Sequence, residues 1–153
     1  MTLEVSRAVV SQSIAELQEA GRSESERVLL WLGRRDGQSL HVLEMFVPEQ
    51  IANYDFFSIP PRSMRVLLRC LRERSLMVAA QVHSHPMEAF HSQADDRWAI
   101  VRHEGALSIV LPYFARTACV ESFLENSATF ALSTTNQWQR VPLPKISNHV
   151  RIP

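Results

Sequence analysis

Two segments of the chain repeat apolar residues at the spacing of a helix with one buried face. The first covers residues 5–20, and Gly21 would be a natural C-terminal stop for it. Its apolar positions are Val9, Val10, Ile14 and Leu17. The second begins at Pro60 and Pro61 and ends near Ser75. Its apolar positions are Met64, Leu67, Leu68 and Leu71.

Shorter apolar runs predict β-strands. Residues 27–33 and 40–48 flank "RRDGQS", whose Asp-Gly pair is typical of a tight turn, so the two runs should pair as a hairpin. Residues 76–83 form a continuous apolar run that stops before Pro86, which is typical of a buried strand. Residues 106–112 predict the next strand.

The remaining segments carry weaker patterns. Ser92 is a suitable N-cap for a helix that ends near Gly105. That helix would carry Trp98, Ile100 and Val101. Short strands are expected at residues 119–123, 129–134 and 137–142. Residues 145–152 could form either a closing helix or an extended tail.

This arrangement of elements predicts a mixed sheet flanked by helices, an α/β fold, although an α+β domain fits the same pattern. The chain has 153 residues, close to the usual size of one domain. We therefore expect residues 1–153 to form a single domain with its own core.

Composition narrows the class of partner. Sixteen basic residues balance sixteen acidic ones, so the net charge favours neither nucleic acid nor an anionic membrane as partner. No stretch approaches the roughly 20 apolar residues that a membrane span needs. Cys70 and Cys119 are far apart in the chain, as expected for reduced thiols rather than a disulfide framework. We expect a cytoplasmic protein.

The stretch "QVHSHPMEAFHSQADD", residues 81–96, concentrates metal-binding side chains. His83 and His85 are two apart on a predicted strand, so they point to the same side of the sheet. Asp95 and Asp96 stand in the first turn of the following predicted helix, close enough to fold back over the strand end. Two imidazoles and one carboxylate would leave a fourth zinc position for water.

Each half of this pattern also has an ordinary interpretation. Most histidines in an H-x-H pair are surface or hydrogen-bonded core residues, and Ser92 with Asp95 can be a helix-capping pair. The conjunction of both halves is a much narrower pattern than either half alone. It favours a catalytic metal site.

Zinc-dependent hydrolysis also needs a carboxylate near the metal to take and return protons. Glu26 is the candidate that we favour, because it begins an apolar strand that could lie beside the one carrying His83. A solvated position at a strand end is the alternative for Glu26. Glu24, Glu44 and Glu88 are its competitors.

These residues resemble the JAMM (MPN-plus) zinc metalloproteases, particularly their compact bacterial, deubiquitinase-like members. The family pattern is a glutamate before an apolar run to glycine, then His-Ser/Thr-His-Pro, then Ser-x-x-Asp. Here the glutamate and glycine are Glu26 and Gly33, "HSHP" covers residues 83–86, and "SQAD" covers residues 92–95. The resemblance spans most of residues 26–114. It implies the MPN/JAMM fold, a cytidine-deaminase-like three-layer architecture.

The resemblance also implies roles for individual residues. His83, His85 and Asp95 would bind Zn²⁺, Glu26 would be the general acid/base, and Ser92 would stabilise the oxyanion. One spacing departs from the family, which usually places ten residues between the second histidine and the aspartate. Nine residues separate His85 from Asp95 and ten separate it from Asp96, yet only Asp95 has a serine three positions earlier.

Members of this family cleave isopeptide or peptide bonds after the C-terminal tail of ubiquitin or ubiquitin-like proteins. The resemblance implies a ubiquitin-like protein or its conjugates as substrate, and the cognate activating and conjugating enzymes as further partners. Residues 49–59 and 87–91 are the loops that would border the tail. Their aromatic residues are Tyr54, Phe56, Phe57 and Phe90, of which some would instead form a satellite core. Processing of a sulfur-carrier protein and a non-catalytic MPN-like scaffold are the alternatives.

Overall fold

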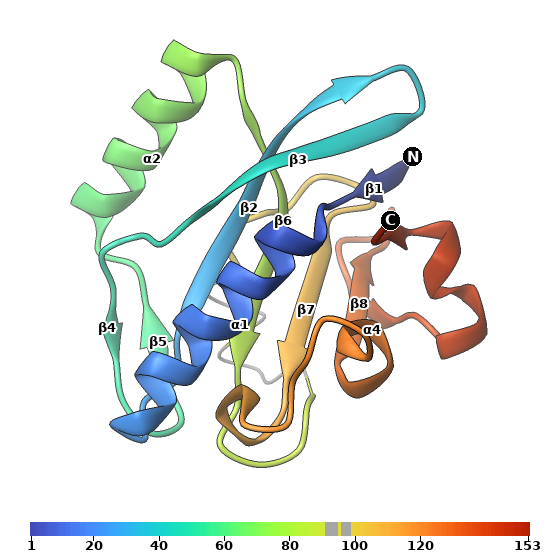
Figure 1. Ribbon diagram of the computed structural model, residues 1–153. Helices are drawn as coiled ribbons and strands as arrows, with labels where there is room; N and C mark the ends of the chain where they lie inside the picture. Colours follow the sequence, from blue (N-terminus) through green and yellow to red (C-terminus); the bar gives the residue numbers. More distant parts are fainter. Residues whose placement is uncertain (91–94, 96–98) are drawn as a thin grey trace.

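The computed structural model describes residues 1–90, 95 and 99–153 (Figure 1). In this part of the chain eight strands form one mixed sheet in the order β10-β1-β3-β2-β6-β7-β8-β9. Their bounds are β1 Thr2–Glu4, β2 Val28–Asp36, β3 Ser39–Phe46, β6 Met77–Ser84, β7 Leu107–Leu111, β8 Ala128–Leu132, β9 Trp138–Arg140 and β10 Val150–Arg151. A separate antiparallel pair consists of β4 Ile51–Ala52 and β5 Phe57–Ser58.

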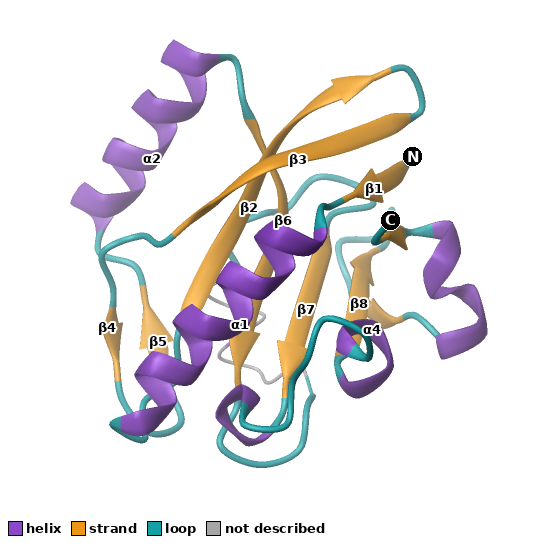
Figure 2. Ribbon diagram, in the orientation of Figure 1, coloured by secondary structure: helices purple, strands orange, loops and turns teal. Residues whose placement is uncertain are grey.

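The helices lie on both faces of the sheet (Figure 2). They are α1 Arg7–Arg22, α2 Pro61–Arg74, α4 Phe123–Asn126 and the 3₁₀ segments η1 Tyr113–Ala115 and η2 Leu143–Asn148. Trp31 of β2 packs in one core with Leu17 of α1, whereas Leu30 packs in a second core with Leu67 of α2. Successive strand residues point to opposite faces, so α1 and α2 cover opposite sides. The predicted α/β class with a mixed sheet is confirmed.

The centre of the sheet forms as the sequence predicts. β2 and β3 pair antiparallel, with Asp36 opposite Ser39 and Gly37 at φ 59° in the turn between them. β6 pairs antiparallel with β2 and parallel with β7. A parallel pair requires a crossover connection, and the segment between β6 and β7 therefore leaves the sheet and returns to it.

Helix α1 differs from the prediction at both ends. It begins at Arg7, where the Ser6 side chain accepts a hydrogen bond from the Val9 amide, and it continues through Gly21 to Arg22. A methyl group on Gly21 would lie 2.6 Å from Cβ of Phe114, so this glycine permits close packing rather than ending the helix. The residues before the helix form β1, which the sequence did not predict.

Helix α2 has the predicted bounds but a narrower apolar face. Leu67 is buried, whereas Leu68 is 55% exposed and lies outside the contact with the sheet. Ser75 ends the helix in a left-handed conformation, with φ 51° and ψ 45°. The exposed residues of α2 include Arg62, Arg65, Arg69 and Arg72.

Two other predictions are wrong. The helix expected from Ser92 falls partly outside the described residues, at 92–94 and 96–98, and it does not extend to Gly105, because residues 99–102 are not helical and Gly105 lies in a turn at φ 77°. The backbone amide of Ile100 donates to the Gln81 side chain and so makes no helical hydrogen bond. Residues 119–123 form a turn and the start of α4 instead of a strand, because the Ser122 hydroxyl bonds locally to Cys119 and Asn126.

The other elements of the C-terminal third agree with those predicted from the sequence. β8 and β9 confirm the strands expected near residues 129–134 and 137–142. The closing segment combines both alternatives, since η2 is followed by β10 at the sheet edge. Within the described ranges, no helix has both the length and the hydropathy to cross a membrane.

Gly33 provides a test of the central hairpin. It follows a shift in the β2–β3 register, and a methyl group there would lie 2.2 Å from the carbonyl oxygen of His41. A backbone atom cannot yield as a flexible side chain can, so we expect Gly33→Ala to lower the free energy of unfolding by about 1–3 kcal/mol. Urea denaturation measures this free energy of unfolding. The exposed Arg35→Ala should stay within about 0.5 kcal/mol of the unmodified protein, and equal stability of the two variants would contradict the crowding at Gly33.

Candidate metal centre

The two histidines of the H-x-H pair lie where β6 leaves the core. Val82 points into the core shared with α1, so His83, its neighbour, points to the opposite face, where it lies opposite Val28 of β2. His85 follows the strand and keeps the same side, with its ring centroid 5.0 Å from that of His83. His83 is fully buried and His85 is 3% exposed. The shared direction predicted for the two imidazoles is confirmed.

Asp95 completes a cluster of three ligand-type side chains. Its Oδ2 lies 3.3 Å from Nε2 of His83 and 3.0 Å from Nε2 of His85. The three side chains are buried, and one ligand atom from each lies within 4.8 Å of the other two. The structure therefore brings Asp95 to the histidines, while Asp96 and Ser92 lie outside the described residues.

The geometry of the cluster fits a zinc ion. Two ligands bound at about 2.0–2.1 Å in a tetrahedral arrangement are about 3.3 Å apart. The separations of Asp95 Oδ2 from the two imidazoles agree with this value. Burial lowers the pKa of His83, against the opposing effect of the Asp95 carboxylate. A neutral imidazole is the form that binds metal, and two imidazoles with one carboxylate are the kind of ligand set that catalytic zinc sites use.

Glu26 stands beside this cluster. Its Oε1 lies 3.9 Å from Nε2 of His85, and its side chain is 4% exposed. Burial raises the pKa of Glu26 to about 8, with further contributions from the negative charges of Asp95 and Asp55. Because a carboxyl group with a raised pKa can exchange a proton near neutral pH, Glu26 has the chemistry of a general acid/base.

The competing glutamates lie elsewhere. Glu24 and Glu88 are exposed. Glu44 pairs with Arg74, whose guanidinium nitrogens lie 2.5 and 2.8 Å from the two carboxylate oxygens. Of these four glutamates, Glu26 is the one whose carboxylate the structure places at the candidate metal centre.

A left-handed turn supports the end of β6, and no residue in the sequence indicated it. Tyr113, Phe114 and Ala115 have φ values of 55°, 52° and 61°, a conformation that non-glycine residues rarely adopt. Within this turn the Phe114 amide donates to the His85 carbonyl at 2.8 Å, and the Tyr113 amide donates to the Met87 carbonyl at 2.9 Å. These bonds fix the backbone on both sides of Pro86. Glycine or asparagine would have been the usual signal for such a turn.

Apolar side chains surround the cluster, and they divide into core and surface. Phe57 is buried and its ring lies 5.3 Å from that of His83, so it belongs to the satellite core. Phe90 is 54% exposed and packs against His85, at 4.7 Å between ring centroids. Tyr54 and Met87 are also exposed. Exposed apolar groups so close to buried polar ones are typical of a binding site.

Comparison with known proteins gives a family match over most of the chain. Residues 6–119 match the model of Prok-JAB, the prokaryotic homologs of the JAB domain. The chain is also similar to the probable metalloprotease y4jG of Sinorhizobium fredii. The two are 32% identical over 156 residues, which cover 99% of this chain and 94% of that protein.

Solved structures share the fold at lower sequence identity. A protein from Desulfitobacterium hafniense superposes with a TM-score of 0.70 at 17% identity, covering 99% of this chain and 93% of the other. A protein from Salinibacter ruber gives a TM-score of 0.61 at 16% identity, covering 98% and 91% of the two chains. These similarities support the fold.

Metal content tests the cluster directly. A single three-ligand site implies about one zinc per chain in purified protein, measurable by elemental analysis. His83→Ala and Asp95→Ala should lose this metal, because each removes one of three ligands. Asp96→Ala is the matched control and should retain it. Loss of zinc in Asp96→Ala but not in Asp95→Ala would contradict the choice of third ligand.

The raised pKa of Glu26 predicts a pH-dependent cost to stability in the metal-free protein. Between the ordinary value of 4.5 and about 8 the folded state keeps a proton that the unfolded state releases, so stability falls as the pH rises through this range. Glu26→Gln removes the titrating group. Its melting temperature in chelator should therefore exceed that of the unmodified protein more at pH 8 than at pH 5.

The exposed Glu24→Gln is the control for this measurement and should show no such pH dependence. A Glu26→Gln difference that is constant between pH 5 and pH 8 would contradict the raised pKa.

Proposed function

The chain belongs to the Prok-JAB family of JAMM-type metalloproteases, and on that premise we propose that it is a zinc-dependent peptidase or isopeptidase that cleaves after the C-terminal tail of a ubiquitin-like protein. One observation carries the proposal. His83, His85 and Asp95 converge at the end of β6, with the Glu26 carboxylate beside them. A non-catalytic scaffold would have no need for this buried set.

Each residue of the cluster has a task in hydrolysis. His83, His85 and Asp95 would hold the zinc ion. When bound, the ion supplies positive charge that acidifies a water to a pKa of about 7, polarises the scissile carbonyl and lowers the pKa of the adjacent Glu26. Glu26 accepts the proton of the attacking water and delivers it to the departing amine nitrogen as the carbon–nitrogen bond breaks. Ser92 is the proposed donor to the carbonyl oxygen.

The surface around the centre supports an extended peptide as substrate. The β4–β5 hairpin carries Tyr54, which is 49% exposed and whose ring packs edge-on against Phe114 at 5.6 Å. Met87 and Phe90 are exposed on the neighbouring loop. An extended tail can lie between such segments with its main chain hydrogen-bonded to a strand edge and its side chains in apolar pockets.

The substrate class follows from this proposal. A flexible tail that leaves a folded ubiquitin-like domain can reach a buried centre that a folded chain cannot enter. The substrate would be a ubiquitin-like precursor or a conjugate, and the cognate activating and conjugating enzymes would be the further partners. The enzyme would then mature the tag or remove it.

Cleavage of a defined probe tests the proposal. The probe is ubiquitin fused through its C-terminal tail to a fluorescent protein, with an isopeptide-linked lysine peptide as a second form. The zinc-loaded protein should cut after the tail, and chelator should stop it. Glu26→Ala should keep the zinc and lose turnover, because it removes the proton acceptor but no ligand.

Two outcomes would count against parts of the proposal. Cleavage of an unstructured peptide but of neither tail-bearing probe would leave a metalloprotease with a different substrate. Turnover at the unmodified rate in Glu26→Ala would remove the proton-transfer role of Glu26. Glu24→Ala, on the exposed surface beside it, is the matched control and should cleave at the unmodified rate.

A further inference from the structure

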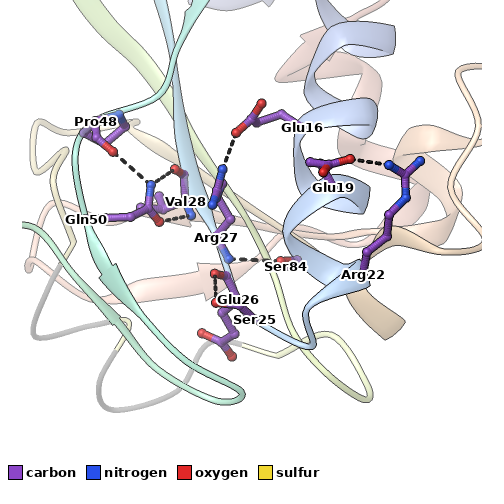
Figure 3. Close-up of polar contacts among 10 residues, drawn as sticks. All are labelled: Glu16, Glu19, Arg22, Ser25, Glu26, Arg27, Val28, Pro48, Gln50 and Ser84. Carbon is purple, nitrogen blue, oxygen red and sulfur yellow. Dashed lines mark hydrogen bonds and ion pairs between the residues drawn. The ribbon is translucent and has the colours of Figure 1, made fainter.

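The edge of β2 next to Glu26 is completed by a side chain instead of a strand. The β2–β3 ladder ends with Leu30 opposite Phe46, and the same register would place Pro48 opposite Val28. Proline has no N–H, so the ladder cannot continue there. The Gln50 amide takes that place, since its Oε1 accepts from the Val28 amide at 2.8 Å and its Nε2 donates to the Val28 carbonyl at 2.9 Å (Figure 3). Gln50 Nε2 also donates to the Pro48 carbonyl at 3.0 Å.

Residues 26–28 are thereby held along both edges. On the β6 side the Ser84 amide donates to the Arg27 carbonyl at 3.1 Å, and the Ser84 hydroxyl accepts from the Arg27 amide at 3.2 Å. On the other side Gln50 holds Val28, and the Asn53 carbonyl accepts from the Glu26 amide at 2.7 Å. Ser84 holds Arg27 through both its backbone amide and its hydroxyl, whereas Gln50 holds Val28 through its side-chain amide alone.

Because side chains alternate along a strand, holding the backbone of residues 26–28 also fixes the face of the sheet to which the Glu26 side chain points. Arg27 forms an ion pair with Glu16 of α1 at 2.5 Å, on one face of the sheet (Figure 3). Glu26 and Val28 point to the other face, where Val28 packs against Phe57 and the Glu26 carboxylate approaches His85. A rotation of this short segment would turn Glu26 away from the metal centre.

We propose that Gln50 is a positioning residue for Glu26, holding the start of β2 so that the Glu26 carboxylate stays beside the metal centre. The inference rests on the proton-transfer role proposed above for Glu26. Val28 is fully buried, so its N–H and C=O groups have no ready access to water if the Gln50 amide is removed. The segment must then move to find other partners, and Glu26 moves with it.

The experiment uses the full chain with Gln50→Ala and the equal-sized Gln50→Glu, which keeps an acceptor but has no N–H for the Val28 and Pro48 carbonyls. The first readout is amide hydrogen exchange by NMR on metal-free protein. The Val28 and Glu26 amides should exchange about tenfold faster or more in Gln50→Ala. The Leu30 amide, farther inside β2, should keep its protection.

The second readout is turnover of the ubiquitin fusion probe by zinc-loaded protein. Both Gln50 variants should keep one zinc and lose about 10- to 100-fold in kcat, the effect of displacing a reacting group by about 1 Å. Ser13→Ala is the matched control, because it removes a buried hydrogen bond to Trp31 on the opposite face of the sheet. It should lower the melting temperature and leave kcat and the exchange of Val28 unchanged.

The outcomes separate this inference from the proposed function. Normal kcat in Gln50→Ala, with kcat lost in Glu26→Ala, would overturn the positioning role alone. Unchanged exchange at Val28 and Glu26 in Gln50→Ala would also overturn it. Normal kcat in both Glu26→Ala and Gln50→Ala would overturn the proposed function and this inference with it.

Discussion

The site depends on the alternation of side chains along one buried strand. β6 lies at the middle of the sheet, so one of its faces must be apolar to pack against α1, and Val82 with its same-face neighbours meets that need. The opposite face is free to carry His83 and, one step beyond the strand, His85. A shift of one residue in the β2–β6 register would exchange the two faces and put the imidazoles into the apolar core.

Electrostatics adds a second constraint. Glu26, His83, His85 and Asp95 are all buried, the last three lie in one cluster, and the Glu26 carboxylate is 3.9 Å from His85. Burial raises the pKa of Glu26, and repulsion from the negative charge of Asp95 adds to this effect, so the site as a whole disfavours negative charge. A divalent cation between the histidines and Asp95 removes this imbalance. The same ion that serves hydrolysis would therefore also stabilise the fold of the site.

Local pattern was enough to predict the central hairpin, β6 and the direction of His83 and His85, because each depends on residues close in sequence. The sequence also favoured Glu26, because it begins an apolar strand and matches the family pattern, and the fold added that Glu24 is exposed whereas the Glu26 carboxylate lies beside His85. The pairing of β1 with β10 joins the two ends of the chain and leaves no local signal. The role of Gln50 could not be predicted from the sequence either. It becomes apparent only when the strand register places Pro48, which has no N–H, opposite Val28.

The left-handed turn at Tyr113, Phe114 and Ala115 has a consequence for how such a protein can change over evolutionary time. Each of these residues is held in a backbone conformation that is unfavourable by roughly 1–2 kcal/mol, and packing against Gly21 and bonds to the carbonyls of His85 and Met87 offset it. Selection for greater thermal resistance would find gains by relaxing this corner. Substitutions that relax the turn would also weaken its bonds to the backbone near His85. Thermal stability and the positioning of a metal-ligand candidate therefore make opposite demands on this turn.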